Sequence, residues 1–172
     1  QQFSTKILVP RTLHQVNKII AVSEATKKDI IEVFKIPQEK IDVVHNGVAP
    51  VTKDELDEAH KEKIHAKYDI RDRYVLFLGT IEPRKNLHRL IEAFHMLHQR
   101  KQFADVQLVI AGGQGWLSRD LNGLVEELKL QKSVIFTGYV SHRTKVCLMK
   151  YASAFVFPSL YEGFGLSLLE AM

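Results

Sequence analysis

The sequence predicts an α/β protein built on a Rossmann-like parallel sheet. From Tyr74 onward, short continuous apolar runs alternate with segments whose apolar residues recur at helical spacing. Continuous apolar runs are typical of strands that are covered on both faces, as parallel strands are. A glycine follows three of these runs, at positions 79, 112 and 138. Because parallel sheets bind ligands outside the carboxyl ends of their strands, these glycines mark the expected site.

Residues 1–50 predict the end of a larger N-terminal domain. Ser23 can cap a helix, and Asn46 and Gly47 indicate a turn. Two strands and one helix are too few for an independent core. The expected strands are residues 19–22 and 41–44, and the expected helix between them is residues 24–34.

Residues 51–73 predict a charged linker between two domains. Asp, Glu, Lys and His crowd positions 54–67, with few apolar residues among them. A helix without an apolar stripe is solvated rather than part of a core. We therefore expect a solvated linker helix that leads into a C-terminal domain over residues 74–172.

The C-terminal domain shows a clear alternation of strands and helices. Its last helix is barely two turns long, so we expect the chain to be truncated at both ends. The expected strands are residues 75–78, 106–111, 134–136 and 154–157, and the expected helices begin near Asn86, Leu117, Ser141 and Gly165.

The composition excludes several classes of protein. The 172 residues are 45% apolar and 26% charged, and no apolar run reaches the length of a membrane-spanning helix. Cys147 is the only cysteine, which leaves no internal disulfide and no cysteine-based zinc site. The net charge of +4 suits phosphate-bearing ligands or anionic membrane surfaces. No basic stripe with interleaved aromatic residues indicates nucleic acid as a partner.

Glu162 and Glu170 form the most informative pattern in the chain. They lie in the segment SLYEGFGLSLLE, which follows an apolar run and Pro158. This order predicts a strand, a glycine-rich turn and a helix that carries the second carboxylate. Helix starts bind anions and carboxylates accept hydrogen bonds from hydroxyls, so the expected ligand is a phosphate flanked by polyhydroxylated groups. The alternative is an ordinary helix start with a surface glutamate.

The loop 79–86, GTIEPRKN, follows the first strand of the C-terminal domain. Gly79 permits a close turn, and Asn86 is expected to cap the next helix. Lys85 immediately precedes that cap, so its ammonium and the helix start should face the same space, which suits a diphosphate. A capping loop with solvated Arg84 and Lys85 is the alternative that the spacing leaves open.

These two segments resemble the donor-binding motifs of retaining GT-B glycosyltransferases of the family 4 or group 1 type, which includes enzymes like glycogen synthase and sucrose synthase. The resemblance covers nearly the whole chain and identifies it as the donor-binding half of a two-domain GT-B architecture. It implies a nucleotide-diphosphate sugar, a UDP- or GDP-sugar, as substrate. It implies no bound cofactor and no metal ion.

The resemblance also assigns roles to residues. Glu162 would bind hydroxyls of the donor sugar, Glu170 would bind those of the ribose, and Lys85 would neutralise the diphosphate, with Lys85 and Glu162 as the expected catalytic residues. Many members have an arginine after the loop glycine where this chain has Thr80. Either Arg84 substitutes for that arginine, or the site relies more on Lys85. The other expected donor-binding residues, several of them through backbone groups, are Gly79, Thr80, Gly138, Tyr139, Val140, Gly163, Phe164, Gly165 and Leu166.

Three further patterns leave alternatives open. The turn 112–116 lacks GxGxxG spacing, so a structural role is at least as well supported as contact with the nucleotide. The segment 138–141 either reads the nucleobase through its backbone or is an ordinary strand-to-helix connection. His88, His95 and His98 can share a helix face, but solvated surface histidines are better supported than a metal site.

The expected activity is transfer of a sugar to a carbohydrate or lipid-linked acceptor with retention of anomeric configuration, as in mannosyltransferases of polysaccharide or glycolipid assembly. We expect a cytoplasmic protein, and lipid-linked acceptors would bring it to the inner face of the membrane. The isolated chain should be inactive because the acceptor site belongs mostly to the N-terminal domain. The alternatives are a non-catalytic nucleotide-sugar-binding module and another enzyme on the same fold, such as a sugar-nucleotide epimerase.

Overall fold

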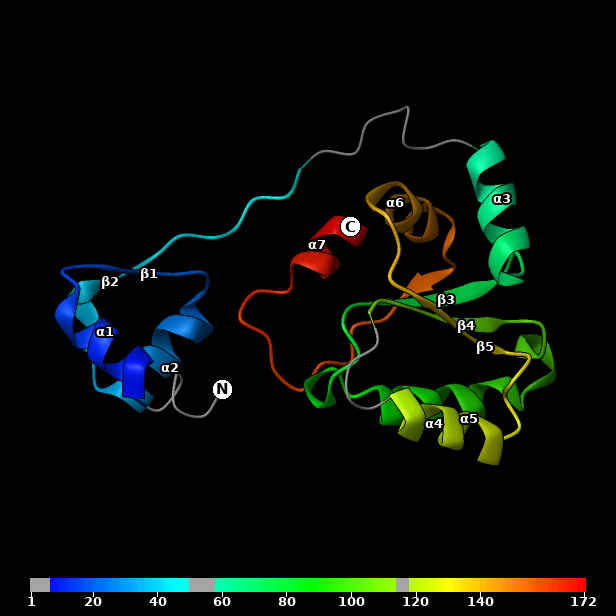
Figure 1. Ribbon diagram of the computed structural model, residues 1–172, viewed down its shortest axis with the longest axis horizontal. Coiled ribbons are helices and arrows are strands. Elements are labelled where there is room, and N and C mark those ends of the chain that lie inside the picture. Colours follow the sequence, from blue (N-terminus) through cyan, green and yellow to red (C-terminus); the bar gives the residue numbers. More distant parts are fainter. Residues whose placement is uncertain (1–6, 50–57, 114–117) are drawn as a thin grey trace. The chain divides into compact units, whose positions relative to one another are not determined.

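The computed structural model describes residues 7–49, 58–113 and 118–172. The chain divides into two compact units (Figure 1). The first comprises Gln1–Val48 together with Glu162–Leu166, and the second comprises Ala49–Tyr161 together with Ser167–Met172.

The first unit is a small parallel sheet with helices beside it. Both predicted strands are present, and they pair in parallel with Ile19 opposite Ile41. The hydroxyl of Ser23 accepts a hydrogen bond from the Thr26 N–H, which confirms the predicted helix cap. The core of this unit consists of Ile19, Ala21, Ile36 and Ile41. In chain order its elements are α1 (Val9–Gln15), β1 (Ile19–Ala21), α2 (Glu24–Phe34), η2 (Gln38–Lys40) and β2 (Ile41–Val43).

The second unit is built on a four-stranded parallel sheet in the order β5-β4-β3-β6. The predicted parallel α/β fold is confirmed, although the last strand keeps only two residues. The strands are β3 (Tyr74–Leu78), β4 (Gln107–Ala111), β5 (Val134–Gly138) and β6 (Ala154–Phe155). The helices are α3 (Glu58–Tyr68), η4 (Pro83–Lys85), α4 (Leu87–His98), η5 (Lys101–Phe103), α5 (Ser118–Glu127), α6 (His142–Tyr151) and α7 (Leu166–Ala171), the last of which begins in the first unit.

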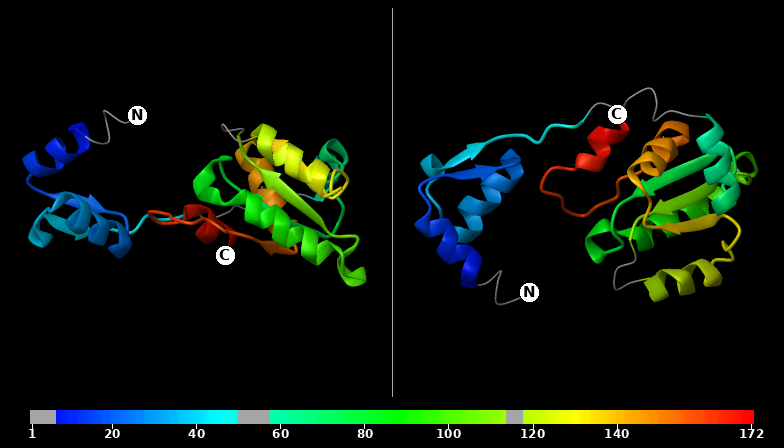
Figure 2. Two further views of the ribbon diagram at one scale, coloured as in Figure 1. Left: turned by 90° about the horizontal axis from the view of Figure 1, so that it is seen from below. Right: turned by 45° about the horizontal axis from the view of Figure 1, so that its top comes forward.

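Helices cover both faces of this sheet, with α4 and α5 on one face and α3 and α6 on the other (Figure 1). Figure 2 shows the same layers from two further directions. Successive side chains of a strand point to opposite faces, so Leu108 and Ile110 join the core under α4 and α5, whereas Val109 joins the core under α6. Every residue of β4 is buried, which explains the continuous apolar run over residues 108–111.

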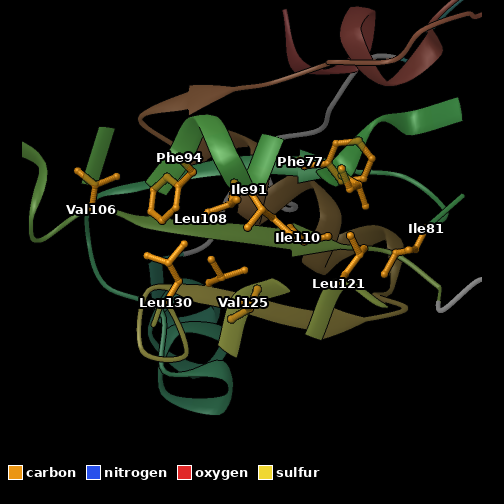
Figure 3. Close-up of a cluster of buried hydrophobic side chains, with 12 residues drawn as sticks. Phe77, Ile81, Ile91, Phe94, Val106, Leu108, Ile110, Leu121, Val125 and Leu130 are labelled. Carbon is orange, nitrogen blue, oxygen red and sulfur yellow. The ribbon is translucent and has the colours of Figure 1, made fainter. Parts of the chain in front are cut away.

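The core beneath α4 and α5 fixes the loop that leads to the expected site (Figure 3). Ile91 and Phe94 from α4 meet Leu121 and Val125 from α5 over the strand residues. Ile81, which lies in the loop 79–86, belongs to the same cluster and is 2% exposed. Ile81 therefore anchors this loop to the core of the second unit.

The prediction of a purely solvated linker helix was wrong for the described part, residues 58–73. Ile64 of α3 is 4% exposed and packs with Tyr74 and Leu148 against the sheet. The charged residues of α3 surround this single isoleucine, which is why the sequence shows no apolar stripe. Tyr68 packs against the same cluster, and the ring of His65 lies 5.7 Å from that of Tyr74, so these residues dock the helix. Among the described helices, none is long and apolar enough to cross a membrane.

Candidate functional site

The strands β3, β4 and β5 end in register at their carboxyl ends. Leu78 pairs with Ala111, and Ala111 pairs with Gly138, so the turns that follow these strands meet at one edge of the sheet. A pocket of about 310 Å³ opens at this edge. It is lined by the turns Gly79–Thr80, Gly112–Gly113 and Tyr139–Val140, together with His142 and Lys145 of α6.

Backbone hydrogen bonds hold these turns together. The Gly79 N–H donates to the Ala111 carbonyl at 2.9 Å, and the Gly112 N–H donates to the Gly138 carbonyl at 2.9 Å. A Cβ atom at position 112 would stand 2.0 Å from the Gly79 carbonyl oxygen, so only glycine allows the two turns to approach this closely. The predicted turn 112–116 is described only as far as Gly113, and its remaining residues lie outside the described part.

Lys85 lies beside the first of these turns. Its side chain is almost covered, with 9% of the residue exposed, and its ammonium nitrogen stands 5.4 Å from the centroid of the Phe157 ring. The same nitrogen lies 3.7 Å from the position that a Cβ of Gly79 would occupy. A positive charge in such a sheltered position acts more strongly on a nearby anion than one in open solvent.

Arg84 connects the 79–86 loop to the segment that precedes Glu162. Its guanidinium donates to the Tyr161 carbonyl at 2.9 Å and lies 2.5 Å from a carboxylate oxygen of Glu82. Its own carbonyl accepts a hydrogen bond from the Leu160 N–H at 2.9 Å. Arg84 therefore connects two loops. A guanidinium carries five N–H donors, so these contacts are compatible with a further contact to a ligand. That Arg84 substitutes for the arginine missing at Thr80 stays a prediction.

Asn86 adds a second fastening between the same two loops. Its side-chain amide donates to the Pro158 carbonyl at 3.2 Å and makes no capping hydrogen bond to α4. The expected cap was therefore wrong for the side chain, although Asn86 does occupy the N-cap position. Its φ of 58° puts its backbone in the left-handed region, which asparagine tolerates better than most residues.

Glu170 is paired with a lysine that the sequence had not singled out. The Lys145 ammonium donates to Glu170 Oε1 at 2.6 Å, and the two side chains are 19% and 29% exposed. Lys145 lies about one turn into α6, after the Ser141 cap, and lines the pocket. The sequence feature that could have indicated Lys145 is its place in the first turns of a helix that begins at the carboxyl end of a strand.

The glycine-rich turn Glu162–Leu166 belongs to the first unit. The carbonyl of Gly163 accepts hydrogen bonds from Ser23 at 2.6 Å and from Thr26 at 3.2 Å. The ring of Phe164 lies 5.6 Å from that of His45. Gly165 has a φ of 88°, a conformation that favours glycine. The first residues of α2 therefore fix the shape of this turn, and Leu166 then begins α7.

The three histidines of α4 do not form a metal site among the described residues. Each has a nearby partner instead. His88 lies 3.1 Å from a carboxylate oxygen of Asp120, His95 bonds the amide of Gln99, and His98 bonds Ser133 and a backbone carbonyl. All three are partly buried, so the expectation of solvated surface histidines was too simple.

Family models match almost the whole chain. The model described as glycosyl transferases group 1 matches residues 60–172. The model described as glycosyltransferase family 4 matches residues 2–51. The two matches meet near the linker that the sequence predicted.

Curated relatives are similar along most of the chain. An O-antigen chain mannosyltransferase B of Escherichia coli is 33% identical over 164 residues, which are 94% of this chain and 42% of the relative. An uncharacterized glycosyltransferase of Methanocaldococcus jannaschii is 33% identical over 159 residues, 90% of this chain and 40% of the relative. The chain thus spans about two fifths of the length of these relatives.

Solved structures confirm the GT-B type of fold. The structure of Anabaena HepE in complex with UDP and glucose matches 99% of this chain and 46% of its own, with a TM-score of 0.78 and 19% sequence identity. At this level of identity the likeness concerns the fold.

Proposed function

The chain belongs to the glycosyl transferases of group 1, and from that premise we propose that it forms the donor-binding part of an enzyme that transfers a sugar from a nucleotide-diphosphate sugar with retention of anomeric configuration. The observation that carries the proposal is the pocket at the carboxyl ends of β3, β4 and β5, with its glycine turns and with Lys145 and Glu170 as a charged pair. In this proposal residues 1–50 end the acceptor-side domain, residues 51–73 link the domains and residues 74–172 bind the donor.

Each part of the donor has a proposed ligand. The backbone of Gly138, Tyr139 and Val140 contacts the nucleobase, and Glu170 accepts hydrogen bonds from the ribose hydroxyls. Lys85 binds the diphosphate beside the turn Gly79–Thr80, with Arg84 in the same loop. Glu162 binds hydroxyls of the sugar, while the backbone N–H groups of 163–166 contact the sugar and its phosphate.

The proposed reaction breaks the bond between the anomeric carbon and the diphosphate. Negative charge grows on the departing nucleoside diphosphate while the sugar becomes oxocarbenium-like. Lys85 stabilises that charge, and its sheltered position strengthens the effect. Glu162 and Glu170 orient the donor rather than act as the acid and nucleophile of a glycosidase, which need both carboxyl groups at one anomeric carbon.

The similarity to an O-antigen chain mannosyltransferase supports a growing polysaccharide or lipid-linked saccharide as acceptor. We propose a GDP- or UDP-sugar as donor, in keeping with the UDP that a solved structure of the same fold contains. With such acceptors, the enzyme would work in the cytoplasm at the inner face of the membrane. No cofactor is needed for this chemistry, because the activated sugar carries its own leaving group.

The test is a transfer assay with the natural full-length polypeptide. Radiolabelled GDP-mannose, UDP-glucose and UDP-N-acetylglucosamine are offered with a membrane extract as the source of acceptors, and the product is analysed by NMR. We expect one donor to label an acceptor with the anomeric configuration that the donor had. An inverted product would contradict retention, and binding of a donor without transfer to any acceptor would favour a binding module.

A further inference from the structure

The pocket at the strand ends contains one permanent cation among its described lining residues, Lys145. Its ammonium donates to Glu170 Oε1 at 2.6 Å, and neither side chain is more than 29% exposed. Charge-assisted hydrogen bonds of this length are among the stronger interactions in proteins. The pair therefore fixes both side chains within the site proposed above.

The backbone of Lys145 is itself well anchored. Its N–H donates to the Ser141 carbonyl at 2.9 Å, in the first turn of α6. The three residues that follow it, Val146, Cys147 and Leu148, are buried against the sheet. Lys145 thus projects from a well-packed part of the fold, whereas Glu170 comes from the short helix α7, whose leucines are 40–42% exposed. The lysine is the more fixed partner.

An unpaired carboxylate at this place would hinder the proposed ligand. A nucleoside diphosphate is strongly anionic, and like charges in a partly buried pocket repel each other. In the β3–α4 loop, the guanidinium of Arg84 lies on Glu82 and the Tyr161 carbonyl. The ammonium of Lys85, in the same loop, lies beside Gly79 and the Phe157 ring. Lys145 is therefore the group best placed to offset the charge of Glu170.

We propose that Lys145 is a positioning residue for the donor nucleotide. Its ammonium donates a hydrogen bond to Glu170 Oε1, which leaves Oε2 to accept hydrogen bonds from the ribose hydroxyls. Its positive charge also offsets the repulsion between the Glu170 carboxylate and the diphosphate of the donor. The proposal rests on the proposed function, because it requires that Glu170 faces a ribose. The competing explanation is that the pair only fastens α7 to α6.

The experiment measures how well the natural full-length polypeptide distinguishes a ribose from a sugar without hydroxyls. Calorimetry gives the dissociation constants for UDP and 2′,3′-dideoxy-UDP, and for GDP and 2′,3′-dideoxy-GDP. The variants are Lys145→Met, Lys145→Arg, Glu170→Gln and the double variant Lys145→Met with Glu170→Gln. Lys150→Met, on the exposed side of α6, removes the same charge away from the pocket. Thermal unfolding shows which variants are folded.

We expect the wild type and Lys150→Met to prefer the ribonucleotide by roughly tenfold or more. Lys145→Met should lose most of that preference, Lys145→Arg should restore much of it, and the double variant should lose little more than Glu170→Gln alone. A Lys145→Met variant that is less stable yet keeps the full preference would show that the pair is only a fastening, which overturns the proposal.

Different results would overturn the proposed donor site and the proposed role of Lys145. A folded wild type that binds neither UDP nor GDP would overturn the proposed donor site and the role of Lys145 with it. A wild type that binds a nucleotide but does not distinguish ribose from dideoxyribose would overturn the role of Lys145 and Glu170 alone.

Discussion

At Lys85 the fold places a positive charge where little solvent reaches it, beside the turn that ends β3. We predict that Lys85→Met lowers the turnover number by roughly 10²- to 10³-fold, because the departing diphosphate loses its main stabilising charge. The measurement is steady-state kinetics of sugar transfer. Lys85→Arg, which keeps the charge, should retain more activity than the methionine variant. Equal losses in both variants would show that packing rather than charge matters here.

Arg84 gives a second prediction at this scale. Arg84→Met removes the hydrogen bond to the Tyr161 carbonyl and the contact with Glu82, so the segment before Glu162 loses a support. We expect the turnover number to fall roughly ten- to hundredfold, because small displacements of orienting groups slow a reaction by such factors. Arg89→Met, an exposed position on α4, is the control. If Arg84→Met instead weakens diphosphate binding with no change in turnover, Arg84 is a ligand and not a support.

Single residues show which contacts the sequence can indicate and which it cannot. The residue types at Lys85, Glu162 and Glu170 were recognisable because each stands at a fixed distance from a glycine or a helix start. Lys145 was not, since its partner Glu170 is far away in the sequence and no local spacing connects them. Asn86 was predicted to cap a helix, but its amide bonds the Pro158 carbonyl, which is near only in the folded chain.

At the scale of elements, the glycine that ends β4 controls how closely two turns can pack. Gly112→Ala would place a Cβ 2.0 Å from the Gly79 carbonyl oxygen, at a φ of 151°. We predict that it destabilises the protein by about 2–4 kcal/mol, since the backbone must move apart. Gly113→Ala is the matched control, because an added Cβ there meets no described atom within 4 Å. Its effect should stay within about 0.5 kcal/mol.

Chemical denaturation of both glycine variants checks this difference. Similar stabilities for Gly112→Ala and Gly113→Ala would contradict the close approach of the two turns. Because both turns line the pocket, their separation in Gly112→Ala should also change the shape of the pocket, which nucleotide titration of the folded fraction can detect.

The helix α3 predicts a dependence of stability on pH. Burial lowers the pKa of His65 below its usual value, and the charge of Lys61 lowers it further. The folded state therefore favours the neutral ring. The unfolded chain binds the proton more readily, so stability is full above about pH 6.5 and is lost as the pH falls through that value and through the pKa of the folded state.

Denaturation midpoints at pH 8, 7, 6 and 5 test this dependence. In His65→Gln the decline below about pH 6.5 should be smaller than in the wild type. His14→Gln, which changes an exposed histidine of the first unit, provides the comparison. The same decline in the wild type and in His65→Gln would contradict the role given to burial.

The sequence predicted the strands and helices well where apolar runs are long, as in β4 and α4. It predicted the helix α3 but not the packing of that helix on the sheet, which Ile64 and Tyr68 make among charged residues. Periodicity carries little information when so few apolar side chains make the contact. The short strand β6 was predicted too long, since the apolar run continues to residue 157, whereas the last hydrogen bond to β3 is the one from the Val156 N–H to the Leu76 carbonyl.

At the scale of the whole molecule, both units are parallel α/β structures, and the group 1 model covers the described part of the second unit almost completely. The predicted family and fold are confirmed. The roles given to the site residues stay predictions, because they depend on a ligand. The pocket at the strand ends is the physical basis for them, since it unites turns that are distant in the sequence.

The most direct measurement is a calorimetric titration of the natural full-length polypeptide with UDP, GDP and ADP, beside Lys85→Ala, Glu170→Ala and the control Lys150→Ala. We predict that one nucleotide binds more tightly than the others and that Lys85→Ala and Glu170→Ala both weaken it, whereas Lys150→Ala does not. Binding that neither substitution weakens, or no binding by a folded sample, would contradict a donor site at the carboxyl ends of these strands.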